Sequence, residues 1–115
     1  MKKLIPIAAL ALVSTCAWSS EYTNIGEGTN SCGSFISDKK EGGHRLGLNY
    51  QWMSGYITGV NNRRAIADPN KESNLGSGLD SESMLLWLEN YCRANPLNNL
   101  ENAAGALVSE LIKRE

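Results

Sequence analysis

The sequence predicts an all-α fold, in which four helices form a small disulfide-stapled bundle around a central helix at about residues 44–65. Three observations favour this fold. Apolar residues recur at three- and four-residue spacing in several segments. Residues that cap or break helices separate those segments. The chain also lacks strand-like alternation of useful length. With 115 residues, it is long enough for one domain with a small core.

Residues 1–19 have the pattern of a secretory signal peptide. Lys2 and Lys3 precede an apolar run at residues 4–13 that is too short to span a membrane, and small residues near 17–19 indicate the cleavage site. Cys16 lies in a weak match to a lipoprotein box, because a threonine precedes it, so a lipid anchor is not expected. The sequence therefore predicts an exported, periplasmic protein without stable membrane insertion.

Cleavage removes Cys16 and leaves two cysteines, Cys32 and Cys92. An even number of cysteines in an oxidising compartment predicts a disulfide. The chain-entropy model gives a loop of this length about 4 kcal/mol of stabilisation. A metal site or a reactive thiol is the alternative, but the sequence lacks a CxxC motif and a Cys/His pairing. We therefore expect one disulfide, no metal and no cofactor.

Residues 20–30 are polar and contain glycines, which predicts an extended leader before a single helical domain at 31–115. Asn30 or Ser31 is expected to cap a short helix that carries Cys32 and runs to about Lys39. The glycines at 42 and 43 end this helix.

The expected central helix, 44–65, carries one apolar stripe formed by Leu46, Tyr50, Met53, Ile57 and Val60. Gly55 and Gly59 lie on the other side of the helical projection, beside further apolar residues. Glycine costs about 1 kcal/mol relative to alanine inside a helix. We therefore interpret this pair as a place where another helix packs closely, with a subunit interface as the alternative.

The segment at 65–80 is rich in helix-breaking residues. A loop this long in so small a domain is either mobile or a contact surface. The candidate partner contacts within it are Ser73, Asn74, Leu75, Ser77 and Leu79.

Two further helices follow this loop. Asp80 or Ser81 is expected to cap the first, which ends by Asn95 because the residue before a proline disfavours helix. Asn95 is expected to cap the second, with Pro96 at its first position. Leucines at three- and four-residue spacing continue this last helix to residue 111.

No catalytic constellation is recognisable in the sequence. His44 is the only histidine, and no serine or cysteine partner stands at motif spacing. Loss of Lys2 and Lys3 lowers the number of basic residues from 11 to nine against 12 acidic residues, a formal net charge of −3 that gives no sign of nucleic-acid binding. We therefore expect a protein-binding protein and not an enzyme.

Three segments carry a resemblance to a known group of proteins. They are CGSF at 32–35, YQWMSGYITGVN at 50–61 and WLENYCRANPL at 87–97. In this order they resemble the small periplasmic proteins grouped with HdeA and with the Rap/Tai immunity proteins of type VI secretion. The match extends from about Cys32 to Leu111, nearly the whole chain after the signal peptide.

This resemblance implies an all-helical fold with one disulfide between the first helical segment and a later one. Immunity-type members bind and inhibit a secreted peptidoglycan amidase, often as dimers, which implies a protein partner and a homodimer. HdeA-type members are acid chaperones for unfolding clients, and a structural role in the envelope is a weaker alternative. The immunity hypothesis is preferred, because HdeA has a closer cysteine pair and lacks the W-x-x-G-Y-x-x-G-x-N segment.

Overall fold

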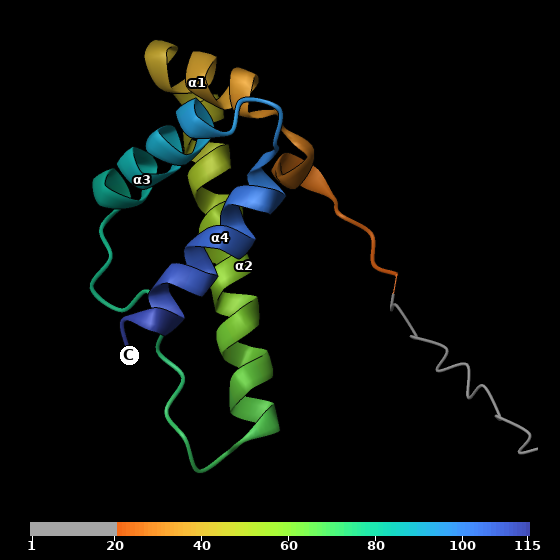
Figure 1. The fold of residues 1–115 in the computed structure, drawn as a ribbon, viewed down its shortest axis with the longest axis vertical. Helices are drawn as coiled ribbons and strands as arrows, with labels where there is room; N and C mark the ends of the chain where they lie inside the picture. The colour runs from red at the N-terminus through yellow and green to blue at the C-terminus, as the bar shows by residue number, and fades with distance from the viewer. Residues whose placement is uncertain (1–20) are drawn as a thin grey trace, which may run out of the picture.

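Four α-helices and one 3₁₀ turn form the computed structural model, which describes residues 21–115. In chain order they are η1 (Gly26–Thr29), α1 (Cys32–Glu41), α2 (His44–Ala67), α3 (Ser81–Ala94) and α4 (Leu100–Lys113) (Figure 1). Within this part of the chain there is no strand, and an isolated β-bridge joins Ser31 to Asn99. The predicted all-α fold with four helices is confirmed. The expected signal peptide, 1–19, lies outside the described residues.

α2 is the central helix of the fold. α1, α3, α4 and η1 all pack against it, and its C-terminal end extends beyond the other helices (Figure 1). Its buried side chains, Asn49, Met53 and Ile57, fall on one stripe. The helix ends at Ala67, slightly beyond the predicted residue 65.

The prediction that Gly55 and Gly59 pack closely against another helix of the chain is wrong. Both glycines are exposed. Among the described residues, no neighbouring atom lies within 4 Å of a Cβ placed at either position. At 100° per residue, both glycines point away from Ile57, whose side chain lies in the core. The packed side of α2 is therefore the apolar stripe, and the described elements leave the two glycines themselves uncovered.

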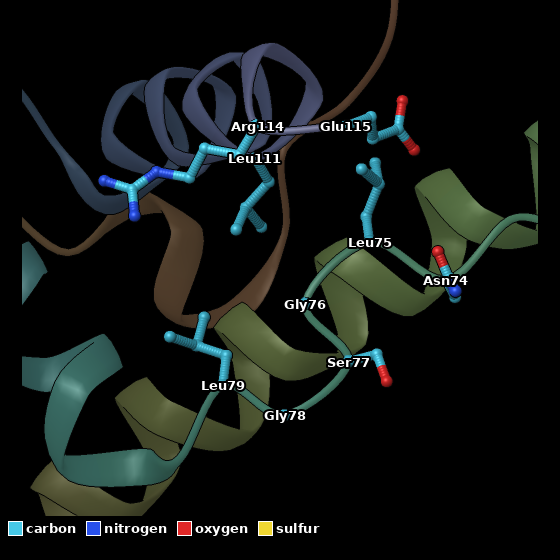
Figure 2. A pocket seen from close by; sticks show the side chains of 9 residues that line it. All are labelled: Asn74, Leu75, Gly76, Ser77, Gly78, Leu79, Leu111, Arg114 and Glu115. Atoms are coloured by element: carbon cyan, nitrogen blue, oxygen red, sulfur yellow. The ribbon is translucent and has the colours of Figure 1, made fainter.

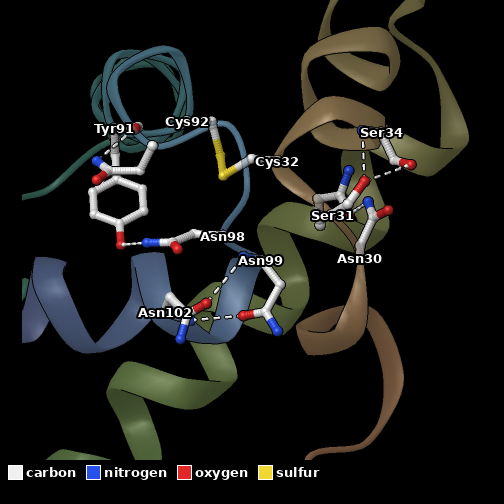
Figure 3. The surroundings of a disulfide bond; sticks show 11 residues. Asn30, Ser31, Cys32, Ser34, Tyr91, Cys92, Asn98, Asn99 and Asn102 are labelled. Carbon is white, nitrogen blue, oxygen red and sulfur yellow. Dashed lines mark hydrogen bonds between the residues drawn. A yellow bond between two sulfur atoms is a disulfide. The ribbon is translucent and has the colours of Figure 1, made fainter.

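The core lies where α1, α3 and α4 meet the packed side of α2. Its largest fully buried apolar side chains are Phe35, Met53, Leu88 and Leu100. Cys32 of α1 and Cys92 of α3 form a disulfide beside them, with their Cα atoms 4.9 Å apart (Figure 3). The predicted disulfide is confirmed, and it joins two helices that are separated by the whole of α2 in the sequence.

Side-chain caps begin α1 and α3 at the predicted positions. The Ser31 hydroxyl accepts a hydrogen bond from the Ser34 N–H at 3.0 Å, and the Asp80 carboxylate accepts one from the Ser83 N–H at 2.7 Å. These bonds satisfy backbone donors that have no partner inside the first helical turn. The hydrogen bonds from Ser83 also lower the pKa of Asp80.

The fourth helix begins later than predicted. Asn95 and Pro96 were expected at its start, whereas α4 begins at Leu100. Its cap is Asn99, which forms a reciprocal capping box with Asn102 (Figure 3). Residues 95–99 therefore form a turn between α3 and α4.

Long-range backbone hydrogen bonds explain this shift. The Cys32 N–H donates to the Asn98 carbonyl at 2.9 Å, and the Leu100 N–H donates to the Asn30 carbonyl at 3.0 Å. The turn before α4 thus pairs with the segment before α1, close to the disulfide. Asn98 also donates to the Tyr91 hydroxyl at 2.7 Å. The local proline signal is overridden by tertiary pairing.

The predicted extended leader is only partly extended. From Gly26 the chain forms η1, which packs against α2 and α4. The Trp52 indole donates to the Ile25 carbonyl at 2.9 Å, and its ring covers Gly28 so closely that a Cβ there would overlap it. The folded domain therefore begins near Gly26 and not at residue 31.

A buried polar cluster ties η1, α1 and α2 together, and the sequence did not indicate it. The Asn49 amide donates to the Asp38 carboxylate at 2.8 Å. The Asn30 amide donates to the same carboxylate at 3.1 Å and to the Asn49 side-chain oxygen at 3.0 Å. Arg45 approaches the other Asp38 oxygen at 3.3 Å. Each buried polar atom of the cluster thus has a partner, which offsets the cost of burial.

Candidate functional site

The segment predicted to contact a partner folds into a loop that runs back along α2. After α2 ends, the chain turns at Asp68, whose carbonyl accepts a hydrogen bond from the Lys71 N–H at 3.1 Å. It then ascends beside the C-terminal half of α2 and enters α3 (Figure 1). Residues 73–79 of this return are called the return loop below.

Asn61 fixes the return loop to α2. Its side-chain amide donates to the Leu75 carbonyl at 2.9 Å, and its side-chain oxygen accepts from the Leu75 N–H at 2.9 Å. The same oxygen accepts from the Ser73 hydroxyl at 3.1 Å. One asparagine therefore satisfies both backbone groups of Leu75, as a neighbouring strand would.

Leu75 and two glycines set the shape of the return loop. The Leu75 side chain is buried in the core at 6% exposure. Gly76 and Gly78 have φ angles of +79° and +78°, a region that favours glycine. A Cβ at Gly76 would lie 3.4 Å from the Ile57 Cγ2 atom. The loop is thus seated on the packed side of α2 by both side-chain burial and close backbone approach.

A cavity of about 440 Å³ opens between the return loop and the end of α4 (Figure 2). The loop backbone forms one wall, and the last turn of α4 forms the other. In Figure 2 the Leu79 and Leu111 side chains approach the opening from opposite walls. The lining residues are Asn74, Leu75, Gly76, Ser77, Gly78, Leu79, Leu111, Arg114 and Glu115.

A second cavity of about 180 Å³ continues between α3 and α4. It shares Leu79, Leu111 and Arg114 with the first and adds Trp87 and Leu107, among others. The two cavities together are called the loop groove. Its centre is apolar, and the exposed loop supplies polar groups along one edge, an arrangement typical of binding sites.

Paired charges border the loop groove. Arg64 donates to both carboxylate oxygens of Glu115, at 3.0 and 2.8 Å. This pairing lowers the pKa of Glu115 and raises the pKa of Arg64. Arg114 donates to Glu110 at 2.9 Å on the other side. Because these charges neutralise one another, the rim suits a mixed polar and apolar surface better than a strongly charged ligand.

The structure divides the five predicted contact residues into two groups. Asn74 and Ser77 are exposed, and Leu79 is half-buried in both cavities, so these three can face a partner. Leu75 is buried in the core, and Ser73 is half-buried and bonded to Asn61. These last two support the loop, and a contact between them and a partner stays a prediction.

Sequence reasoning missed the other wall of the groove. Leu111, Arg114 and Glu115 read as the ordinary end of an amphipathic helix, and Asn61 reads as a solvated position. Nothing in the local pattern indicates that the chain end meets the return loop. The only available signal was the uninterrupted apolar spacing of the last helix, which predicts that the helix packs but not against what.

The described residues offer no further site chemistry at the loop groove. His44 begins α2, about 25 Å along the helix from Asn61 at 1.5 Å per residue. In residues 21–115 no group of three or more His, Cys, Asp or Glu side chains is arranged to hold a metal ion. In the same range, none of the helices is both long and apolar enough to cross a membrane.

Comparison of the chain with protein-family models, curated proteins and solved structures finds no match. The immunity and chaperone hypotheses therefore depend on the three sequence segments and on the geometry of the loop groove.

Proposed function

We propose that the protein is an exported protein-binding protein of the immunity type, which inhibits a secreted peptidoglycan amidase by presenting the return loop to it. The observation that carries this proposal is the attachment of the loop, in which Asn61 holds both backbone groups of Leu75. A loop that is already fixed before binding loses little conformational entropy when a partner engages it.

The surface around the loop supports a protein partner. Asn74 and Ser77 offer exposed hydrogen-bonding groups, and Leu79 offers apolar surface at the centre of the loop groove. Ser77 stands between two glycines, so it projects from a narrow part of the chain. A narrow, rigid loop of this kind can enter a cleft of a partner protein. The apolar groove beside the loop can then be buried against the rim of that cleft.

The test uses the chain from residue 20 and the secreted amidase encoded by an adjacent gene. We expect tight binding and loss of amidase activity, measured by calorimetry and by peptidoglycan hydrolysis. Ser77→Arg should weaken binding at least tenfold, because it places a bulky charge at the loop tip. Leu97→Arg, at a residue that is 99% exposed on the α3–α4 turn, is the matched control. Equal affinity for both variants would remove the return loop from the proposal.

An acid chaperone is the second candidate, and two ion pairs favour it. Lys39 contacts Glu89 at 2.7 Å between α1 and α3, and Arg64 contacts Glu115 at 2.8 Å between α2 and the chain end. Acid neutralises both carboxylates and so loosens contacts between elements. This function requires the protein to suppress aggregation of a test client near pH 2 and not at pH 7. A client that aggregates equally with and without the protein at pH 2 excludes it.

A further inference from the structure

A small polar cavity lies on the α2 side of the return loop. Its volume is about 180 Å³, and it differs from the loop groove because its far wall is α2 instead of α4. The lining residues are Tyr50, Ser54, Ile57, Thr58, Asn61, Leu75, Gly76, Leu79 and Met84. This cavity is called the hydroxyl pocket below.

The α2 wall of the hydroxyl pocket carries oxygen atoms that can accept hydrogen bonds. The Ser54 hydroxyl donates to the Tyr50 carbonyl at 3.0 Å, and the Thr58 hydroxyl donates to the Ser54 carbonyl at 2.9 Å. Each hydroxyl therefore uses its one hydrogen within the helix and keeps lone pairs for a further partner. Residues 50, 54 and 58 are each four apart, so their side chains follow one another along the same face of α2.

The Tyr50 hydroxyl is a further hydrogen-bonding group of the pocket residues. Tyr50 is half-buried, and its hydroxyl has no hydrogen-bond partner within residues 21–115. In the same range, no buried side-chain nitrogen or oxygen lacks a partner, so the Tyr50 oxygen is accessible from outside. A phenolic hydroxyl both donates and accepts. The wall thus combines one free hydroxyl with two acceptor oxygens.

The floor of the hydroxyl pocket is apolar. Ile57, Leu75 and Met84 line it, and all three belong to the core. Gly76 lines the loop side without a side chain, and its backbone lies close to Ile57. The pocket therefore suits a ligand that has an apolar face and a hydroxylated edge.

The lining of the hydroxyl pocket carries no charge. All of its lining residues belong to the described part of the chain, and none is Asp, Glu, Lys, Arg or His. A charged ligand would lose hydration there without gaining a counter-charge. The volume is also below the range of about 300–1,000 Å³ that is typical of pockets for drug-sized ligands. These properties favour a small neutral ligand.

We propose that the hydroxyl pocket binds one ring of a neutral saccharide. The hydroxyl groups at the edge of a sugar ring donate to the Ser54 and Thr58 oxygens, and the C–H groups on its face pack against the apolar floor. This site is separate from the surface proposed to meet an amidase, so the proposal goes beyond the proposed function and does not depend on such a partner.

Titration of the disulfide-bonded chain from residue 20 with glucose tests the site, with amide NMR as the measurement. We expect saturable shifts of the Gly76 and Leu79 amides. The dissociation constant should lie in the millimolar range, because a single small ring makes few contacts. If the amides of the lining residues do not respond to glucose, the pocket holds only water and the proposal is overturned.

Removal of the acceptor oxygens tests the assigned contacts. The double variant Ser54→Ala with Thr58→Val should raise the dissociation constant at least fivefold. Tyr50→Phe, which removes only the hydroxyl, should raise it by a smaller factor. Ser109→Ala is the matched control, because the Ser109 hydroxyl donates to the Gly105 carbonyl of α4 at 3.0 Å in the same way but lies outside the pocket. Circular dichroism checks that each variant is folded. Equal affinity of the double variant and the control would overturn the proposal.

Charged sugars of the same ring size test the selectivity. Glucuronate and protonated glucosamine should each bind at least fivefold more weakly than glucose, because the pocket offers no counter-charge. Equal binding of either charged sugar would overturn the proposal. Methyl glucoside then distinguishes the two sources of a sugar ring. An affinity equal to that of glucose supports the end of a glycan as the ligand, and a lower affinity supports a free monosaccharide.

Discussion

The side chain of Asn61 replaces a neighbouring strand for Leu75, donating to its carbonyl and accepting from its N–H, both at 2.9 Å. The pairing joins the C-terminal half of α2 to the return loop, and Leu75 follows Asn61 by 14 residues in the sequence. It explains how a segment with glycines at 76 and 78 keeps one conformation while its tip stays exposed. The loop groove depends on this pairing, because one of its walls is the backbone that Asn61 holds.

Replacement of Asn61 is expected to release the return loop. In Asn61→Ala both backbone groups of Leu75 lose their partner, which costs about 1–3 kcal/mol for buried groups. Chemical denaturation should show this loss of stability, and hydrogen exchange at the Leu75 amide should accelerate. Asn74→Ala is the control in the same loop, since Asn74 is exposed. Unchanged protection of Leu75 in Asn61→Ala would contradict the anchoring role.

The buried Asp38–Asn49 pair is expected to be equally sensitive. Asn49 is fully buried and donates to Asp38 at 2.8 Å. Asn49→Ala leaves a buried carboxylate with fewer donors, and we expect a loss of about 1–3 kcal/mol in urea unfolding. Gln51→Ala, an exposed substitution in the same helix, should change stability by less than about 0.5 kcal/mol. Similar values for the two variants would show that the cluster contributes little.

The local chemistry of the sequence predicted where helices begin more reliably than what they touch. Ser31 and Asp80 cap α1 and α3 as expected, because a cap needs only a side chain and the first turn. The predicted start of α4 was wrong, because the position where this helix begins depends on the hydrogen bond between Asn98 and the segment before α1. The preference of Asn-Pro for a helix start is local, and hydrogen bonds between distant segments of the chain override it here.

The loop groove shows the same limit. Composition predicted that the 65–80 segment is either a mobile loop or a contact surface, and the resemblance to immunity proteins directed attention to residues 73–79. The exposed members of these residues line the groove. Its other wall, Leu111 and Glu115, required the chain end to be brought beside the loop. The packing of another helix of the chain against Gly59 was also predicted wrongly, because the helical projection places a glycine on a face but does not say whether anything lies against that face.

Alanine substitutions should distinguish a glycine that is packed against a neighbour from a glycine with open space around it. A Cβ at Gly28 would overlap the Trp52 ring and the Asn24 side chain, so Gly28→Ala is expected to destabilise the fold by about 1–3 kcal/mol. Gly47 lies in α2 with open space around its Cβ position, and Gly47→Ala should stabilise by up to about 1 kcal/mol. Thermal unfolding of both variants checks the opposite signs. A stable Gly28→Ala would mean that η1 can move away from Trp52 without cost.

Acid is expected to weaken the contacts of α1 with α3 and of the chain end with α2. The hydrogen bond from Lys39, with that from Arg93, lowers the pKa of Glu89, and the hydrogen bond from Arg64 lowers the pKa of Glu115. Because each pKa is lower in the folded state, the stabilisation is complete above the unfolded glutamate value of about 4.3 and is lost as the pH falls through the folded values. The melting temperature should therefore decline below about pH 4.

A double variant, Glu89→Gln with Glu115→Gln, tests this assignment. Its melting temperature should decline less over the same pH interval. The melting temperature of Glu82→Gln should follow that of the parent protein, because Glu82 forms no ion pair in the described structure. If the melting temperature of all three proteins falls in parallel with pH, Glu89 and Glu115 are not the groups responsible.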